Sequence, residues 1–293
     1  MAEPRPALGL AAALAVVGLW SGFLLISRFG IRADVAAVDL AALRFGVSGV
    51  VMLPVLWVLG FGGLAWWQAA FLAVSGGLGF GLFVYTGFTM APAAYAAILL
   101  PGVLPLYTTL LAWAVLGDRL TAARALPLAL IATGIGALAI AALVELDGQR
   151  LWGAACFLVG SFSWACLTIA LRHWHIEAVR GTAVVAVLAG AVYVPIYLLF
   201  LPVGLGQLGW PTLIVQGFYQ GICAVVLALL AFTFAVRHLG PTTTTMITAT
   251  TPAVVAVSAI FVLDEPVTPS IALGVAAVVA GGILTARAAA RAR

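Results

Sequence analysis

Arg44 is the one charged residue that falls well inside an apolar stretch of this sequence, and it is the first candidate for chemistry. A charge within a membrane span is costly and normally faces the interior of a helix bundle or a cavity. Arg44 could therefore supply the counter-charge for a substrate carboxylate. The alternative is an arginine that extends to the nearby membrane surface and pairs with Asp39. The sequence leaves both interpretations open.

Aromatic residues could supply the walls of such a site. Trp20 and Trp164 fall deep inside two separate apolar stretches, and Tyr85 and Tyr95 fall in two others. Flat apolar faces of this kind suit an apolar or aromatic ligand. Plain packing between helices is the alternative for each of them.

Prolines and threonines could add a polar surface without charge. Pro105 and Pro252 each lie near the middle of an apolar stretch, where a proline removes a backbone hydrogen bond and kinks the helix. The freed carbonyl must be satisfied by protein or by a water-filled cavity. Thr244 and Thr248 could add hydroxyls there, although threonines also bond back to their own helix. The predicted substrate-binding residues are Trp20, Ser21, Arg44, Tyr85, Tyr95, Trp164, Thr244 and Thr248, with helix kinks at Pro105 and Pro252.

Catalytic and metal-binding patterns are missing from the sequence. It contains no GxSxG or HExxH motif, no Asp or Glu in the middle of an apolar stretch, and histidines only at the ends of such stretches. Catalysis needs its groups within reach of one another, so we expect no enzyme, no cofactor and no metal. The lack of central carboxylates also disfavours a proton relay and favours facilitated or exchange transport.

The composition identifies the class of protein that must hold these residues. The 293 residues are 65% hydrophobic and 8% charged, whereas an ordinary globular protein is about 25% charged. The chain is therefore predicted to be an all-α polytopic membrane protein. Its net charge of +4, carried by arginine alone, reports orientation rather than binding of nucleic acid. The predicted spans, each of about 20 residues, are 8–27, 35–58, 67–88, 92–115, 122–143, 152–171, 181–201, 211–235, 240–262 and 269–287.

The sequence also repeats itself. Five of the ten spans fall in each half, and because five is odd, the second half enters the membrane from the opposite side. Such inverted repeats around a central site are the architecture of alternating-access transporters. Chance matches between alanine-rich helices are the alternative. We predict one five-helix repeat at 1–147 and a second, inverted one at 148–293, around a central cavity. The coinciding pairs include Pro105 with Pro252 at an offset of 147, and Trp20 with Trp164 and Arg28 with Arg172 at an offset of 144.

The arginines predict the orientation. With the N-terminus in the cytoplasm, nine arginines fall on the cytoplasmic side and three on the outer side. Cytoplasmic segments carry the excess of positive charge in membrane proteins. Both termini should therefore be cytoplasmic.

Three short motifs carry a family resemblance: Gly18–Phe23 reads GLWSGF, Leu43–Phe45 reads LRF, and Leu116–Thr121 reads LGDRLT. With five-plus-five spans, they resemble the drug/metabolite transporter superfamily, and in particular its EamA-type exporters, a group that includes the bacterial aromatic amino acid exporter. Members commonly have glutamate at the end of the fourth and ninth helices, where this sequence has Asp118 and Asp264–Glu265. The resemblance implies export of small organic solutes across the bacterial inner membrane, through helices that alternate around a central cavity.

We therefore predict a secondary transporter that exports small metabolites, foremost aromatic or other apolar amino acids. A channel or a lipid-handling membrane protein is the alternative. The expected partners are a small-molecule substrate and membrane lipid, without nucleic acid. The oligomeric state is open, and a monomer is compatible with the sequence.

Overall fold

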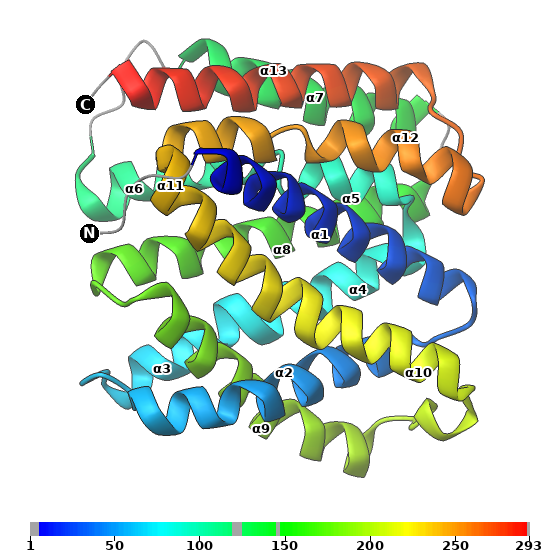
Figure 1. The fold of residues 1–293 in the computed structure, drawn as a ribbon. Coiled ribbons are helices and arrows are strands. Elements are labelled where there is room, and N and C mark those ends of the chain that lie inside the picture. The colour runs from blue at the N-terminus through cyan, green and yellow to red at the C-terminus, as the bar shows by residue number, and fades with distance from the viewer. Residues whose placement is uncertain (1–5, 119–124, 145–146, 292–293) are drawn as a thin grey trace.

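The computed structural model describes residues 6–118, 125–144 and 147–291, and these form a bundle of helices (Figure 1). Apolar stretches of this length become helices because a helix satisfies its own backbone hydrogen bonds in lipid. The first half contains α1 (Pro6–Arg32), α2 (Ala37–Leu59), α3 (Trp66–Leu72), the π-helical stretch η1 (Ala73–Gly79), α4 (Phe80–Met90), α5 (Ala93–Leu99), α6 (Leu104–Leu116) and α7 (Ala125–Val144). The second half contains α8 (Gly148–His173), α9 (Ala178–Phe200), the short 3-10 turn η3 (Leu205–Gln207), α10 (Trp210–Gly217), the π-helical stretch η4 (Phe218–Leu227), α11 (Ala228–Thr248), α12 (Thr251–Leu263) and α13 (Pro269–Arg291).

Eight helical stretches among the described residues are long and apolar enough to cross a membrane. Two further apolar helices, Leu126–Ala141 and Pro269–Leu284, are shorter than that. The chain is thus a polytopic helical membrane protein, and the count of ten spans stays a prediction. α1 begins and α13 ends on the same side of the bundle (Figure 1).

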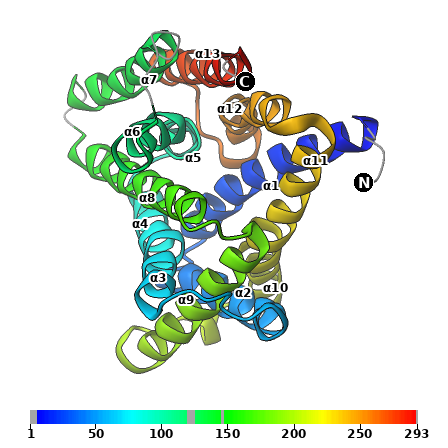
Figure 2. The ribbon, with the colours of Figure 1, turned by 90° about the vertical axis from the view of Figure 1, so that its left-hand side faces the viewer.

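The two halves pack in a reciprocal way. α2 packs against α9 and α7 packs against α13, each helix meeting its counterpart in the other half. α1 packs against α11 and α12, and α8 correspondingly packs against α4 and α6 (Figures 1 and 2). Gly49 and Gly190 allow a close approach of α2 and α9, since a Cβ on Gly190 would lie 2.7 Å from the Phe45 carbonyl oxygen. Small residues at such crossings let two backbones come together.

The prolines interrupt the helices, as predicted. α5 ends at Leu99 and α6 begins at Leu104, with Pro105 in its first turn. In the second half Pro252 likewise lies in the first turn of α12. In the second half the two stretches that could span the membrane, Trp210–Leu239 and Thr243–Leu263, meet close to the predicted boundary between 235 and 240. The helix α11 itself continues to Thr248, and its interruption comes just before α12.

Candidate functional site

Arg44 is buried inside the bundle, where two aromatic rings flank its side chain. The residue is 6% exposed, and its guanidinium carbon lies 5.1 Å from the centre of the Phe23 ring and 5.4 Å from that of Phe80. These rings come from α1 and α4 and present their faces to the cation. Within the described part of the chain, Nη1 of Arg44 is buried without a hydrogen-bond partner.

Asp39 does not neutralise Arg44. Its carboxylate accepts hydrogen bonds from the Tyr197 hydroxyl and from the backbone N–H of Gly204, the latter at 3.1 Å. These contacts tie the start of α2 to the end of α9 and the segment that follows it. The interpretation of Arg44 as the ion-pair partner of Asp39 is therefore wrong, and no carboxylate of the described structure forms an ion pair with Arg44.

A chain of hydrogen bonds runs next to Arg44, through the phenol of Tyr85. The Tyr85 hydroxyl donates to Oε1 of Gln220 at 2.9 Å. The Gln220 amide donates to the Ser27 hydroxyl at 2.9 Å and to Oε1 of Gln216 at 3.1 Å. Because these amides are buried, each bond spares a polar group from lying unpaired in an apolar interior. We call Arg44, Phe23, Phe80, Tyr85 and Gln220 the central polar site.

Sequence reasoning missed the two glutamines of this network. Gln216 and Gln220 lie one helical turn apart inside the apolar stretch 211–235, which places both on one face. Gln220 belongs to the π-helical stretch η4, and the first half has its own π-helical stretch, η1, in the corresponding helix. Such stretches occur frequently at functional sites. A pair of amides inside an apolar span is the feature of the sequence that could have indicated this network.

The two predicted tryptophans lie in different surroundings. Trp164 packs against Phe80 with ring centres 4.8 Å apart, so it is one ring away from Arg44. Trp20 instead stacks on Phe232 of α11 at 5.8 Å. Both are partly buried. The structure therefore brings Trp164 to the central polar site and places Trp20 against a helix of the other half.

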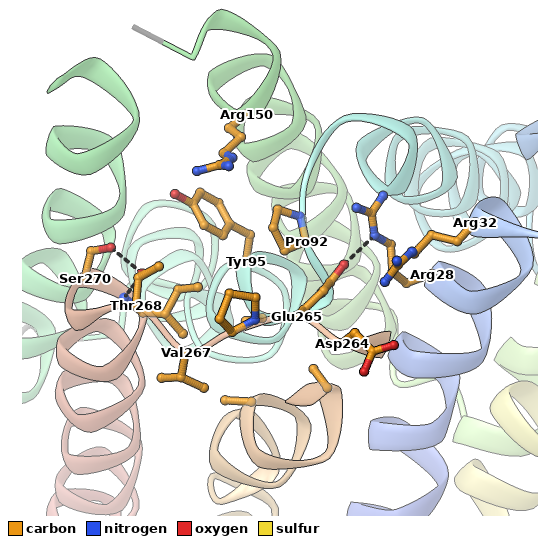
Figure 3. A pocket seen from close by; sticks show the side chains of 15 residues that line it. Arg28, Arg32, Pro92, Tyr95, Arg150, Asp264, Glu265, Val267, Thr268 and Ser270 are labelled. Carbon is orange, nitrogen blue, oxygen red and sulfur yellow. Dashed lines mark hydrogen bonds and ion pairs between the residues drawn. The ribbon is translucent and has the colours of Figure 1, made fainter. Parts of the chain in front are cut away.

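Tyr95 and Ser21 are both buried, but neither belongs to the central polar site. Tyr95 lines a cavity of about 340 Å³ where α1 and α12 end, together with Arg28, Arg150 and Glu265 (Figure 3). The walls of that cavity do not include Arg44. Ser21 lies in α1, and its hydroxyl is buried without a partner among the described residues.

The threonines at the second interruption bond largely to their own helix. The Thr248 hydroxyl donates to the Thr245 carbonyl at 3.3 Å, and the Thr251 hydroxyl donates to the Thr248 carbonyl at 2.7 Å. Thr244 is buried in the same helix. The carbonyl that Pro252 was expected to free is thus occupied, which favours the local bonding that was the alternative. At the first interruption, Ser161 of α8 donates to the Leu100 carbonyl at 2.9 Å.

Long apolar helices in two reciprocally packed halves, with a buried cation and amides between them, define a polytopic membrane protein with an internal polar site. The sequence matches the EamA-like transporter family twice, over residues 7–140 and 151–287. The chain therefore belongs to the EamA-like transporter family and is a membrane transporter of the drug/metabolite type.

Solved structures support the fold alone. A crystal structure described only as that of a protein matches with a TM-score of 0.65 and 17% sequence identity, over 96% of this chain and 98% of the other. A search of the curated proteins found no match.

Proposed function

We propose that this transporter exports small organic metabolites that carry a carboxylate and an apolar body, foremost aromatic or other apolar amino acids, across the bacterial inner membrane. The substrate binds between the two halves, and the halves expose the site to each side of the membrane in turn. The observation that carries the proposal is the buried guanidinium of Arg44 with an unpartnered Nη1.

A carboxylate is the ligand that this guanidinium lacks. Burying an unpaired cation costs free energy, and a substrate anion would recover part of that cost through a charge-assisted hydrogen bond. The guanidinium also offers a planar set of donors that matches a carboxylate in shape. The rings of Phe23 and Phe80, which flank the cation, supply apolar surface for the body of the same substrate.

The amide network offers a place for the amino group. Oε1 of Gln220 accepts a hydrogen bond from Tyr85, and an ammonium group could take over that acceptor. Gln216 lies next to it and would remain bonded to Gln220. The Thr248 carbonyl is less suited to bind the amino group, because it already accepts from Thr251.

Competition between an amino acid and its amide tests the proposal. Protein reconstituted in liposomes preloaded with phenylalanine should take up labelled phenylalanine by counterflow, and phenylalanine should compete better than phenylalaninamide, which lacks the carboxylate. Arg44→Gln should lower the apparent affinity for phenylalanine at least about tenfold, since a hydrogen bond to a charged group is worth about 1.5–3 kcal/mol. It should also remove the discrimination against the amide. Arg237→Gln, which alters an exposed arginine of α11, is the matched control.

Three outcomes would contradict the proposal. Equal competition by the acid and the amide would show that the carboxylate is not recognised. Unchanged transport in Arg44→Gln would remove Arg44 from the site. Flux that neither saturates nor shows counterflow would identify a channel instead of a carrier.

The two tryptophans provide an internal comparison. Trp164→Ala should weaken the binding of phenylalanine by on the order of 0.5–1.5 kcal/mol, the value of an aromatic contact beyond its buried area. Trp20→Ala should weaken phenylalanine binding less, because Trp20 packs on Phe232 and not on the rings around Arg44. In Trp164→Ala, the binding of alanine should be weakened less than the binding of phenylalanine. Equal losses in both variants and for both substrates would mean that the tryptophans only pack the bundle.

A further inference from the structure

Two ion pairs join one half of the protein to the other. Nε of Arg28, in α1, lies 2.8 Å from Oε1 of Glu265, which follows α12. Nη1 and Nη2 of Arg172, in α8, lie 2.9 and 3.2 Å from the two carboxylate oxygens of Asp118, which follows α6. Each pair therefore takes its arginine from one half and its carboxylate from the other.

The two pairs are equivalent by the internal repeat. Arg28 corresponds to Arg172 at the offset of 144, and Asp118 corresponds to Glu265 at the offset of 147 that also relates Pro105 to Pro252. The internal repeat therefore relates each ion pair to the other. The same kind of contact between the two halves occurs twice in the fold.

The backbone that presents each carboxylate is duplicated as well. α6 and α12 both end with a residue in the left-handed region, Gly117 with φ 71° and Asp264 with φ 49°. The carboxylate residue comes next and bonds back into the helix, a common way to end a helix. These bonds run from Asp118 N to the Ala112 carbonyl and from Glu265 N to the Ala259 carbonyl, both at 3.2 Å.

The pairs lie at opposite ends of the bundle. α1 ends on the right of Figure 1 and α8 ends on the left. We call these the Arg28 end and the Arg172 end. At the Arg28 end the pair borders the 340 Å³ cavity, where Figure 3 shows Glu265 reaching toward Arg28.

We propose that the two ion pairs are the latches of an alternating gate, and that each one separates when its own end of the transporter opens. An inter-half ion pair suits this task because the separated charges regain water in the open state, so the bond is cheap to exchange. The crossing of α2 with α9, which includes the buried bond between Tyr197 and Asp39, has no such compensation and serves as the fixed contact. The proposal requires a transporter with two mouths and does not depend on the carboxylate substrate proposed above.

In this structure the Arg28 latch is the more enclosed of the two. Its side chains are 18% and 12% exposed, against 58% and 30% for Arg172 and Asp118. Arg28 also donates to the Phe88 carbonyl at the end of α4, and Oε2 of Glu265 accepts from the first N–H of α5 at 2.9 Å. The Arg28 latch is thus the less exposed of the two and is bonded to two further helices, and the Arg172 end should open more readily.

Distances between spin labels at each end test the proposal without any substrate. Labels are placed at exposed positions in a background in which the three native cysteines are replaced by serine. The label pairs are Ala33 with Val267 for the Arg28 end, and Ala114 with His173 for the Arg172 end. Glu265→Gln should lengthen the distances at the Arg28 end alone, with the open-to-closed ratio rising about tenfold, because a partly buried pair is broken. Asp118→Asn should lengthen those at the Arg172 end alone, with a rise of about two- to fivefold for an exposed pair.

Two further variants test whether the change in distance comes from the loss of that particular ion pair. Asp147→Asn removes an ion pair of the same length, 2.8 Å to Arg150, but within one helix, and it should change neither distance. The exchange Arg28→Glu with Glu265→Arg should restore the closed distance at the Arg28 end in part, because the ion pair returns while the bonds to the Phe88 carbonyl and to the first N–H of α5 do not. Unchanged distances in both single variants, or equal lengthening at both ends, would overturn the proposal. If Glu265→Gln fails to fold, Asp118→Asn at the exposed pair decides the question by the same criterion.

Discussion

The Arg28 end and the Arg172 end contain the same ionic joint in different surroundings. At the Arg172 end both guanidinium nitrogens reach the Asp118 carboxylate, but the pair is exposed. At the Arg28 end a single nitrogen reaches Glu265, and the pair is enclosed and tied to two further helices. A bidentate geometry is therefore not the stronger joint here. The burial of an ion pair and the other hydrogen bonds of its side chains decide how much the pair contributes to stability.

The largest expected effect is the labelling of introduced cysteines, which should be all or none according to which end of the transporter faces outward. Gly148→Cys and Gly206→Cys, at the Arg28 end, should react with an impermeant thiol reagent in intact cells. Both glycines are exposed, and a Cβ there meets nothing within 4 Å. Glu177→Cys, at the Arg172 end, should react only after permeabilisation, because the arginine distribution predicts that this end is cytoplasmic. The reverse pattern would invert the orientation and make the enclosed end the cytoplasmic one.

The largest loss of stability should follow from Glu265→Gln. The change leaves Arg28 enclosed without its carboxylate and weakens the acceptor for the first N–H of α5. We expect the free energy of unfolding to fall by about 2–3 kcal/mol, below the range for fully buried pairs because some exposure remains. Unfolding in mixed detergent and dodecyl sulfate micelles measures it. A loss no greater than that of Asp118→Asn would abolish the difference between the two ends.

Arginine-to-lysine variants separate charge from geometry. Arg28→Lys keeps the charge but cannot reach both Glu265 and the Phe88 carbonyl with a planar set of donors. We expect a loss of about 1 kcal/mol, the value of a typical hydrogen bond. Arg172→Lys should lose less, since its exposed pair depends mainly on charge. Equal losses in the same unfolding assay would show that the extra bonds at the Arg28 end contribute nothing.

The smallest effect should come from Asp118→Asn. An exposed ion pair contributes about 0–1 kcal/mol, and salt screens it further. The variant should therefore unfold within about 1 kcal/mol of the parent, and the difference should shrink when the salt concentration is raised. A large loss that salt does not change would mean that the Arg172 end is as tightly held as the Arg28 end.

Much of the scaffold could be predicted from residue types in order along the chain. Apolar stretches of spanning length predicted the helices, and Pro105 and Pro252 predicted the interruptions, because a missing backbone N–H acts on its own helix. The coincidence of Arg28 with Arg172 was also visible in the sequence. The division between the spans 211–235 and 240–262 was close to that of the structure, whereas the continuation of the helix to Thr248 could not be predicted.

The site could be predicted only in part. Arg44 was found because a charge in an apolar stretch stands out, whatever its neighbours are. Its surroundings were not found, since Phe23, Phe80 and Gln220 come from three other helices. Thr248 was given a binding role that its bond to Thr245 argues against, because a hydroxyl has the same appearance in a sequence whether or not it is already bonded.

The sequence by itself thus determined a helical membrane protein with an internal repeat, through properties that each segment carries alone: apolar length, proline position and charge. Only the tertiary structure decided which charges meet. Arg28 pairs with a carboxylate 237 residues away, while Arg44, only five residues from Asp39, forms an ion pair with no carboxylate of the described structure. The reason is geometric. A helix directs neighbouring residues to different faces. The packing of helices from the two halves then decides which side chains each face meets.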